Sequence, residues 1–326
     1  MDALSEILKT IRLTGATFVE AELAGPWTFE TPPPRALADA LMPDADHIVP
    51  YHLVTAGSCV ARVPPDSGLE LTEGDVVVFP HGDEHVLSGA GQGPARPLAL
   101  QDLSRVLARG KVAPLRTGGT GPLTGLVCGF FAVDRHLAAP MLAGLPRVFR
   151  VSLSDDPGAR WLHSSVRFSV AEAATPRAGA ATVLAKLSEL LFVEAIRRYV
   201  EQVPDDQKGW LAGLRDPHVA QALALLHGRP EHAWTVAGLA REVGQSRSVF
   251  AERFTYYLGQ PPMKYLTMWR LALAADQLRH GRASIGRIAI QAGYDSEAAF
   301  TRAFKREFGT PPATWRRAAA GAPSAR

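Results

Sequence analysis

The sequence predicts an α+β protein with a β-rich N-terminal half and an all-helical C-terminal half. Three observations support this prediction. Short β-favouring segments separated by glycine and proline turns occur up to residue 153, which is typical of an antiparallel barrel or sandwich. A long helical pattern follows at residues 179–200. Two copies of a pattern of two short helices joined by a glycine turn then occupy residues 235–262 and 284–317.

The N-terminal half begins with a predicted short helix at residues 1–15. Seven β-favouring segments are expected after it, at 17–22, 27–31, 48–56, 59–63, 76–79, 125–133 and 148–153. Residues 88–125 are predicted to be rich in loops, because glycines cluster in this region. Two cysteines are too few for a disulfide framework. The N-terminus lacks the apolar run of a signal peptide, and no segment reaches membrane-spanning length, so we expect a cytoplasmic protein with no membrane partner.

The helix at 179–200 carries more apolar surface than one contact needs. Its leucines at 184, 187 and 191 lie on one side, and further apolar residues widen that face. We predict a homodimer contact through Leu184, Leu187 and Leu191, with packing against the chain's own barrel as the alternative. The polar stretch at 201–210 contains a proline and is predicted to be the linker. The expected domains are therefore 1–178, a helix and linker at 179–209, and 210–326.

The second copy of the helical pattern has a start, a break and a buried stripe. Ser284 is a suitable N-cap, and Gly293 suits the left-handed turn that ends the first helix. Asp295 or Ser296 can cap the second helix, in which phenylalanines recur every four residues and must face a core. The residues predicted to face outward from this helix are Glu297, Ala298, Thr301, Arg302, Lys305 and Arg306.

The first copy repeats these features. Thr235 and Ser246 are the predicted caps, Gly244 is the break, and Phe250 and Phe254 begin the buried stripe. The residues predicted to face outward are Arg247, Ser248, Ala251, Glu252 and Thr255. Arg253 is expected either to share that face or to pair with a nearby carboxylate. Both copies end in Gly-x-Pro-Pro, and the stretch between them predicts a connecting helix.

A capped helix with a basic outer face is the physical description of a helix that reads the DNA major groove. Residues 235–317 hold 13 Lys and Arg against 6 Asp and Glu, whereas the rest of the chain is mildly acidic. Two such units with a connecting helix, the second ending GYDSEAAFTRAFKREFG-x-PP, resemble the DNA-binding domain of AraC-type transcription regulators. The resemblance implies that both second helices enter successive major grooves of double-stranded DNA. It also implies RNA polymerase as a partner and activation as the commoner role.

Within the outward set, the predicted roles differ. Arg302 is expected to read a base, because a guanidinium binds guanine through two hydrogen bonds. Lys305 and Arg306 are expected to contact the phosphate backbone.

The N-terminal half contains one further motif, G-x5-P-x-G-x2-H, running from Gly74 to His85. It resembles the second signature of cupin barrels, whereas the first signature is poorly kept. The half is therefore similar to the cupin-type sensor domain of one AraC-type subgroup, and the resemblance implies that this domain senses a signal.

The chemistry of the sensor half stays open at this stage. A zinc site formed by His52, Cys59, His85 and Cys128 is one hypothesis, since imidazole and thiolate are zinc ligands. Buried cysteines with hydrogen-bonded histidines are the alternative. No catalytic constellation is recognisable, so we predict a non-enzyme that responds to an unknown small molecule or redox signal. A cupin enzyme fused to a DNA-binding domain is the rival class.

Overall fold

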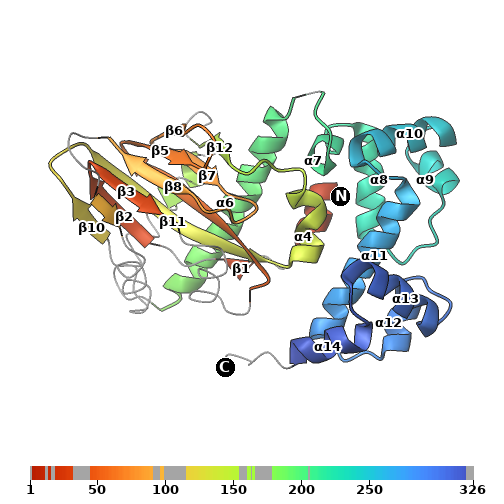
Figure 1. Cartoon of the computed structure of the whole chain (residues 1–326). Coiled ribbons are helices and arrows are strands. Elements are labelled where there is room, and N and C mark those ends of the chain that lie inside the picture. Colours follow the sequence, from red (N-terminus) through yellow and green to blue (C-terminus); the bar gives the residue numbers. More distant parts are fainter. Residues whose placement is uncertain are drawn as a thin grey trace. The chain divides into compact units, whose positions relative to one another are not determined.

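The computed structural model describes residues 2–11, 14–15, 19–31, 45–90, 96–98, 115–153, 160–162, 164–165, 178–204 and 206–320. The chain forms two compact units, each assembled from separate stretches (Figure 1). Residues 13–133 and 145–202 form what we call the sandwich unit. Residues 1–12, 134–144 and 203–326 form the helical unit. None of the helices in the described residues is long and apolar enough to cross a membrane.

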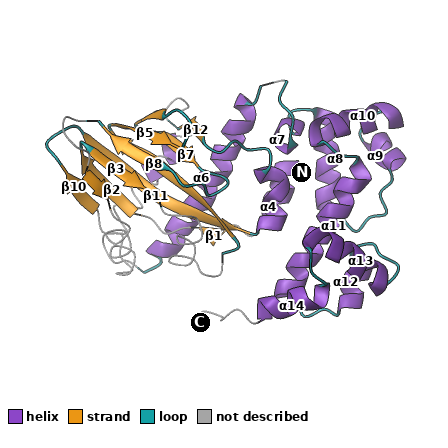
Figure 2. Ribbon diagram, viewed as in Figure 1, coloured by secondary structure: helices purple, strands orange, loops and turns teal. Residues whose placement is uncertain are grey.

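The sandwich unit contains two β-sheets, drawn in orange in Figure 2. The first sheet has the order β10-β2-β11-β4-β7-β12, with β1 paired to β11. Its strands are β1 (Thr14–Gly15), β2 (Val19–Ala24), β4 (His47–Ala56), β7 (Asp75–Val78), β10 (Leu115–Gly118), β11 (Leu123–Val133) and β12 (Phe149–Ser152). The second sheet has the order β6-β5-β8-β3-β9. Its strands are β3 (Trp27–Glu30), β5 (Ser58–Arg62), β6 (Leu69–Thr72), β8 (Val86–Gly89) and β9 (Arg96–Leu98).

A continuous apolar core holds this unit together. Trp27, Leu71 and Phe79 are fully buried in it, and residues of both sheets contribute to the same cluster. Burial of such large apolar side chains is the main favourable term in folding. The predicted antiparallel β architecture is confirmed, although β9 and β10 pair in parallel with their neighbours.

Part of the loop-rich prediction for residues 88–125 is wrong. Strands β9 and β10 lie in this region, and residues 91–95 and 99–114 lie outside the described part of the chain. β9 contains Pro97, and β10 ends at Gly118, which Gly119 follows directly. Their pairing with β3 and β2 comes from distant segments, so the local pattern could not reveal it.

Helix α6 (Ala180–Gln202) packs on its own sandwich unit. Phe192 lies against Phe131 of β11 with ring centroids 4.8 Å apart, and the Ser188 and Tyr51 hydroxyls lie 3.2 Å apart. Leu191 is fully buried, so it is not available for the predicted dimer contact. Leu187 is half-buried, and the side chain of Leu184 is outside the described part. Among the side chains of this helix that the structure describes, the large apolar ones that are exposed are Val183 and Leu190.

The helical unit holds the two predicted helix-turn-helix copies (Figure 2). The first copy is α9 (Val236–Glu242) and α10 (Arg247–Leu258), and the second is α12 (Ile285–Gln291) and α13 (Glu297–Phe308). The other helices of this region are α7 (Trp210–Gly213), α8 (Pro217–Gly228), α11 (Pro262–His280) and α14 (Pro312–Ala320). The connecting helix predicted between the copies is α11.

Two helices from the N-terminal half belong to the helical unit. These are α1 (Ala3–Thr10), which packs against α8, and α4 (Arg135–Leu142), which contacts α11. Asp134, the N-cap of α4, forms an ion pair with Arg279 of α11 at 3.1 Å. The compact units therefore interleave along the chain. The domains predicted from the sequence, 1–178, 179–209 and 210–326, were contiguous segments. The reason is that these two helices bury their apolar faces on distant helices, which no local pattern shows.

Candidate DNA-binding surface and sensor interior

The second helix of each copy is positioned by the same local devices. The Ser246 and Ser296 hydroxyls accept hydrogen bonds from backbone N–H groups at the starts of α10 and α13. Gly259 and Gly309 end these helices with φ of 68° and 76°, which glycine adopts without strain. The predicted caps Thr235 and Ser284 and the breaks at Gly244 and Gly293 are confirmed as well.

The phenylalanine stripes face the interior as predicted. Phe250 and Phe254 of α10, and Phe300 and Phe304 of α13, are fully buried. None of the eleven residues predicted to face outward is buried. Ala251, Thr255 and Thr301 are half-buried, and the exposed ones are Arg247, Ser248, Glu252, Glu297, Ala298, Arg302, Lys305 and Arg306. The two helices thus present polar faces to solvent.

On α10 some of the polar groups have internal partners. Arg253 Nε lies 2.8 Å from Asp216 Oδ2, and Asp216 also caps α8, so Arg253 joins α10 to α8. This ion pair is the pairing with a nearby carboxylate that the sequence offered as one of two possibilities for Arg253. The Thr255 hydroxyl donates to the Ala251 carbonyl at 2.7 Å, within the same helix. On α13 the side chains of Arg302, Lys305 and Arg306 are all exposed.

The sensor interior contains a buried pair of histidines. His85 follows the left-handed Gly82 and points inward, as the cupin-like motif predicts, and only 1% of it is exposed. Its Nδ1–H donates to the Asp83 carbonyl at 2.8 Å, so the neutral ring has an acceptor at Nε2. His52 Nε2 lies 2.9 Å from that atom and donates to it. His52 Nδ1 then has no hydrogen-bond partner among the described residues.

Burial keeps both histidines neutral. It lowers the pKa of His85 to about 4, and burial together with the neighbouring His85 lowers the pKa of His52 well below its usual value. Phe79 stacks on the His85 ring with centroids 3.5 Å apart. The pair is therefore an uncharged, hydrogen-bonded part of an apolar core.

The structure does not assemble the four predicted zinc ligands. Cys59 is buried in the apolar core, Cys128 packs against that core, and both thiols are free. Burial raises the pKa of each thiol to about 12, so both are protonated at neutral pH in the metal-free protein. Within the described part of the chain, no three His, Cys, Asp or Glu side chains are placed to hold one metal ion. His52 and His85 are in hydrogen-bond contact, Cys128 of β11 lies opposite His52 of β4 in the sheet, and zinc binding stays a prediction.

The sequence reasoning missed the α4 helix and a cavity beside it. The cavity walls come from five segments that are separated in the sequence, and no pattern within any one of them shows that they meet. A possible signal was the Asp134 cap followed by small residues at 139, 140 and 143, which fits a short helix with one open face.

A helical unit with two capped helix-turn-helix copies and exposed basic side chains, attached to a cupin-like β-sandwich, defines a DNA-binding regulator. Residues 2–201 match the Cupin family model, and residues 239–318 match the Helix-turn-helix domain model. A Streptomyces antibioticus protein described as an AraC-like transcription regulator is 33% identical over 97% of this chain and 99% of its own length. The chain belongs to the AraC family of transcription regulators.

The chain is also similar to a second curated regulator and to a solved DNA-binding domain. The HTH-type transcriptional regulator AlkR of Acinetobacter baylyi is 30% identical over 97% of this chain and 99% of that protein. The crystal structure of the AdpA DNA-binding domain with a target DNA has 28% identity and a TM-score of 0.30. It covers 31% of this chain and 91% of that one.

Proposed function

We propose that this regulator activates transcription by placing α10 and α13 in successive major grooves of one operator. The observation that supports this most directly is the exposed basic face of α13, formed by Arg302, Lys305 and Arg306. The long helix α11 separates the two copies and buries Leu266 and Trp269, so each second helix extends from a shared scaffold. RNA polymerase is the partner that activation requires.

Arg302 is the proposed base-reading residue. Arg302→Ala should lower affinity for the cognate operator by about 1–3 kcal/mol and relax the preference at one base position in a binding selection. Lys305→Ala should weaken all duplexes alike and flatten the salt dependence of binding. Lys264→Ala, at an exposed position outside both second helices, is the matched control. An unchanged base preference in Arg302→Ala would contradict the assignment.

The cupin-like unit is proposed to receive an organic signal. A signal regulates only if it binds two arrangements of the protein with different affinity. The packed core around His52 and His85 favours a structural role for those residues over catalysis. Substrate turnover that vanished in His85→Ala, with the fold intact by circular dichroism, would establish the rival enzyme class instead.

Zinc or thiol oxidation is the alternative signal. Metal analysis of the purified protein, with operator binding before and after oxidation, distinguishes this alternative from an organic signal. About one equivalent of zinc that falls in both Cys128→Ser and His85→Ala would support zinc binding. Metal-free protein whose operator affinity does not respond to peroxide would leave an organic signal.

A homodimer through α6 is also proposed. Val183, Leu187 and Leu190 recur at helical spacing and expose apolar surface, with Val183 49% and Leu190 46% exposed. Leu187→Glu with Leu190→Glu should convert a dimer into a folded monomer in analytical ultracentrifugation, whereas Thr182→Glu should not. A wild type that sediments as a monomer at micromolar concentration would disprove the contact.

A further inference from the structure

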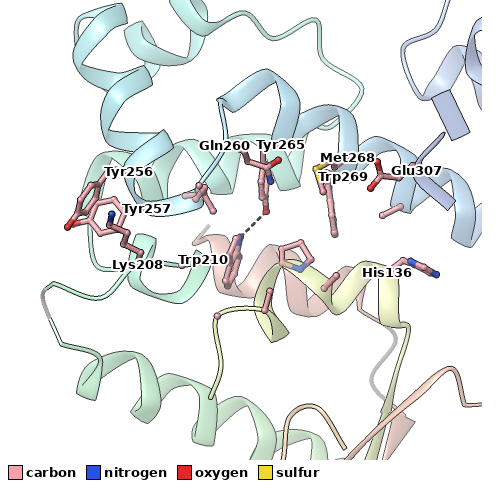
Figure 3. A pocket seen from close by; sticks show the side chains of 18 of the residues that line it. His136, Lys208, Trp210, Tyr256, Tyr257, Gln260, Tyr265, Met268, Trp269 and Glu307 are labelled. Carbon is pink, nitrogen blue, oxygen red and sulfur yellow. Dashed lines mark hydrogen bonds between the residues drawn. The ribbon is translucent and has the colours of Figure 1, made fainter. Parts of the chain in front are cut away.

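The helical unit contains a cavity of about 590 Å³ (Figure 3). It lies beside α4 and is closed by α7, α11 and the last turns of α10 and α13. All of its lining residues belong to the one compact unit. Cavities of about 300–1,000 Å³ are the size that holds a small organic molecule.

The α4 side of the cavity is built from small residues. His136, Ala139, Pro140 and Ala143 line it at helical spacing, and the two alanines are exposed. The opposite face of α4 is buried and carries larger apolar residues, including Leu137 and Met141. The His136 ring reaches Phe308 at one end, with centroids 5.0 Å apart, whereas the two alanines leave the space beside them unfilled.

The facing wall is aromatic and fixed by hydrogen bonds. Trp210, Tyr265 and Trp269 line it and are almost fully buried. The Tyr265 hydroxyl accepts from Trp210 Nε1 at 2.9 Å and donates to His227 Nε2 at 2.7 Å (Figure 3 shows the first of these bonds). Burial lowers the pKa of His227 to about 3 and raises that of Tyr265, so this wall carries no charge at neutral pH. Flat rings are the natural partners of such a wall.

Charge is present only at the ends of the cavity. Lys208 and Glu307 lie at opposite ends in Figure 3. The Lys208 ammonium lies 4.6 Å from the centre of the Tyr256 ring and is exposed. The helix-turn-helix region contributes 13 basic against 6 acidic residues over 235–317, so its overall field attracts anions. An anionic group is therefore favoured at the Lys208 end, with its apolar body toward Trp269.

We propose that this cavity binds a flat aromatic molecule with one negative charge and that the bound molecule regulates DNA reading. Tyr256 and Tyr257 belong to the last turn of α10, and Glu307 and Phe308 to the last turn of α13. One occupant therefore touches the ends of both DNA-reading helices and the α4 helix at once. Its binding free energy differs between arrangements of these helices, which is the requirement for regulation. The regulatory part of this proposal rests on the proposed DNA contacts.

The test uses the full chain and three probes that share one flat aromatic body: naphthalene-2-carboxylate, naphthalene-2-carboxamide and 2-naphthylmethylammonium. Calorimetry measures affinity, and quenching of Trp fluorescence reports contact with the wall. We expect saturable binding with the carboxylate tightest. Ala143→Phe and Ala139→Phe should each weaken it by about tenfold or more, because the new ring fills the cavity. Ala313→Phe, at an exposed position of α14 outside the cavity, is the matched control.

The charge assignment has its own variants. Lys208→Gln should weaken binding of the carboxylate and leave the carboxamide unchanged, whereas Lys264→Gln should change neither. Tighter binding of the ammonium probe that is lost in Glu307→Gln would overturn the anionic class. Absence of saturable binding by all three probes, or equal binding by the Ala143→Phe, Ala139→Phe and Ala313→Phe variants, would overturn the site.

Operator binding is measured on the same proteins. Ala143→Phe that binds operator normally but no longer responds to the carboxylate would support the site and its regulatory role. An operator affinity that the bound carboxylate does not change would overturn the regulatory role. A wild type that binds the carboxylate but no duplex would count against the DNA contacts and leave the cavity site standing.

Discussion

The two helix-turn-helix copies share a backbone design but differ in how their side chains are used. Each has a second helix of 12 residues, a serine N-cap and a left-handed glycine at its end. On α10, Arg253 is engaged by Asp216, whereas on α13 the cations Arg302, Lys305 and Arg306 are exposed. Repetition of a sequence pattern therefore conserves the geometry of a reading helix without conserving the charge it presents.

The surroundings of the copies differ as well. The first copy lies next to a buried polar network of Trp210, His227 and Tyr265. The second is closed by α14, where Trp315 packs on Phe304 and Phe308 at centroid distances of 5.7 and 5.1 Å. The first copy thus lies against a network that contains a titratable group, His227, whereas the second is covered by aromatic side chains, with Trp315 also donating to the Ala275 carbonyl.

The largest expected effect tests whether both copies depend equally on their buried stripes. Phe254→Ala and Phe304→Ala should each lower the free energy of unfolding by about 3–5 kcal/mol, because each leaves a cavity in a closed core. Ile290→Ala, at a side chain that is 72% exposed, should change it by less than about 0.5 kcal/mol. Chemical denaturation measures all three. A cost for Phe304→Ala no larger than that for Ile290→Ala would show that the stripe does not support the second copy.

Acid should weaken the first copy through His227. Its pKa is lowered to about 3 in the folded protein and is near 6.5 when unfolded, so the unfolded state binds the proton first. The stability contributed by neutral His227 is complete above pH 6.5. It falls by roughly 1.4 kcal/mol per pH unit as the pH drops from 6.5 toward 3. Unfolding curves between pH 7 and pH 4 measure this loss.

The control for that prediction is His227→Gln, which removes the titrating group. The variant should be less stable at pH 7 but should have a flatter pH dependence than the wild type. His85 in the sandwich unit also has a lowered pKa, and it contributes the same pH dependence to both proteins. Parallel pH profiles for the two proteins would therefore contradict the role of His227.

A smaller effect distinguishes the two kinds of arginine. Arg306→Ala should weaken operator binding by about 1 kcal/mol or less and leave stability unchanged, because its side chain is exposed. Arg253→Ala should instead lower the free energy of unfolding, since it frees Asp216, which is 6% exposed. Filter binding and thermal unfolding separate the two effects. Equal losses of DNA affinity in both variants would place Arg253 on the reading face.

An effect of similar size concerns the caps. Ser246→Ala and Ser296→Ala should each cost about 1 kcal/mol of stability, whereas the corresponding glycine variants should cost only a few tenths. Thermal unfolding of the four variants measures the difference. Similar values at the two sites would extend the shared backbone design to its energetics, and an alanine variant as stable as the wild type would remove the cap from that design.

The sequence by itself determined the local devices of the helical unit. Ser246, Gly259 and Gly309 could be placed correctly because a cap or a left-handed turn depends on residues within one or two turns. For α13 the sequence offered Asp295 or Ser296, and the structure shows that the cap is Ser296. The inward direction of His85 was predictable for the same reason, since the turn at Gly82 precedes it directly.

Only the tertiary structure decided which distant segments meet. It placed α1 and α4 in the helical unit and buried Leu191 in the sandwich unit. It also formed the cavity between the small residues of α4 and the aromatic wall around Trp269. Such contacts depend on complementary shape and burial between segments far apart in the chain, so a local residue pattern does not encode them in readable form.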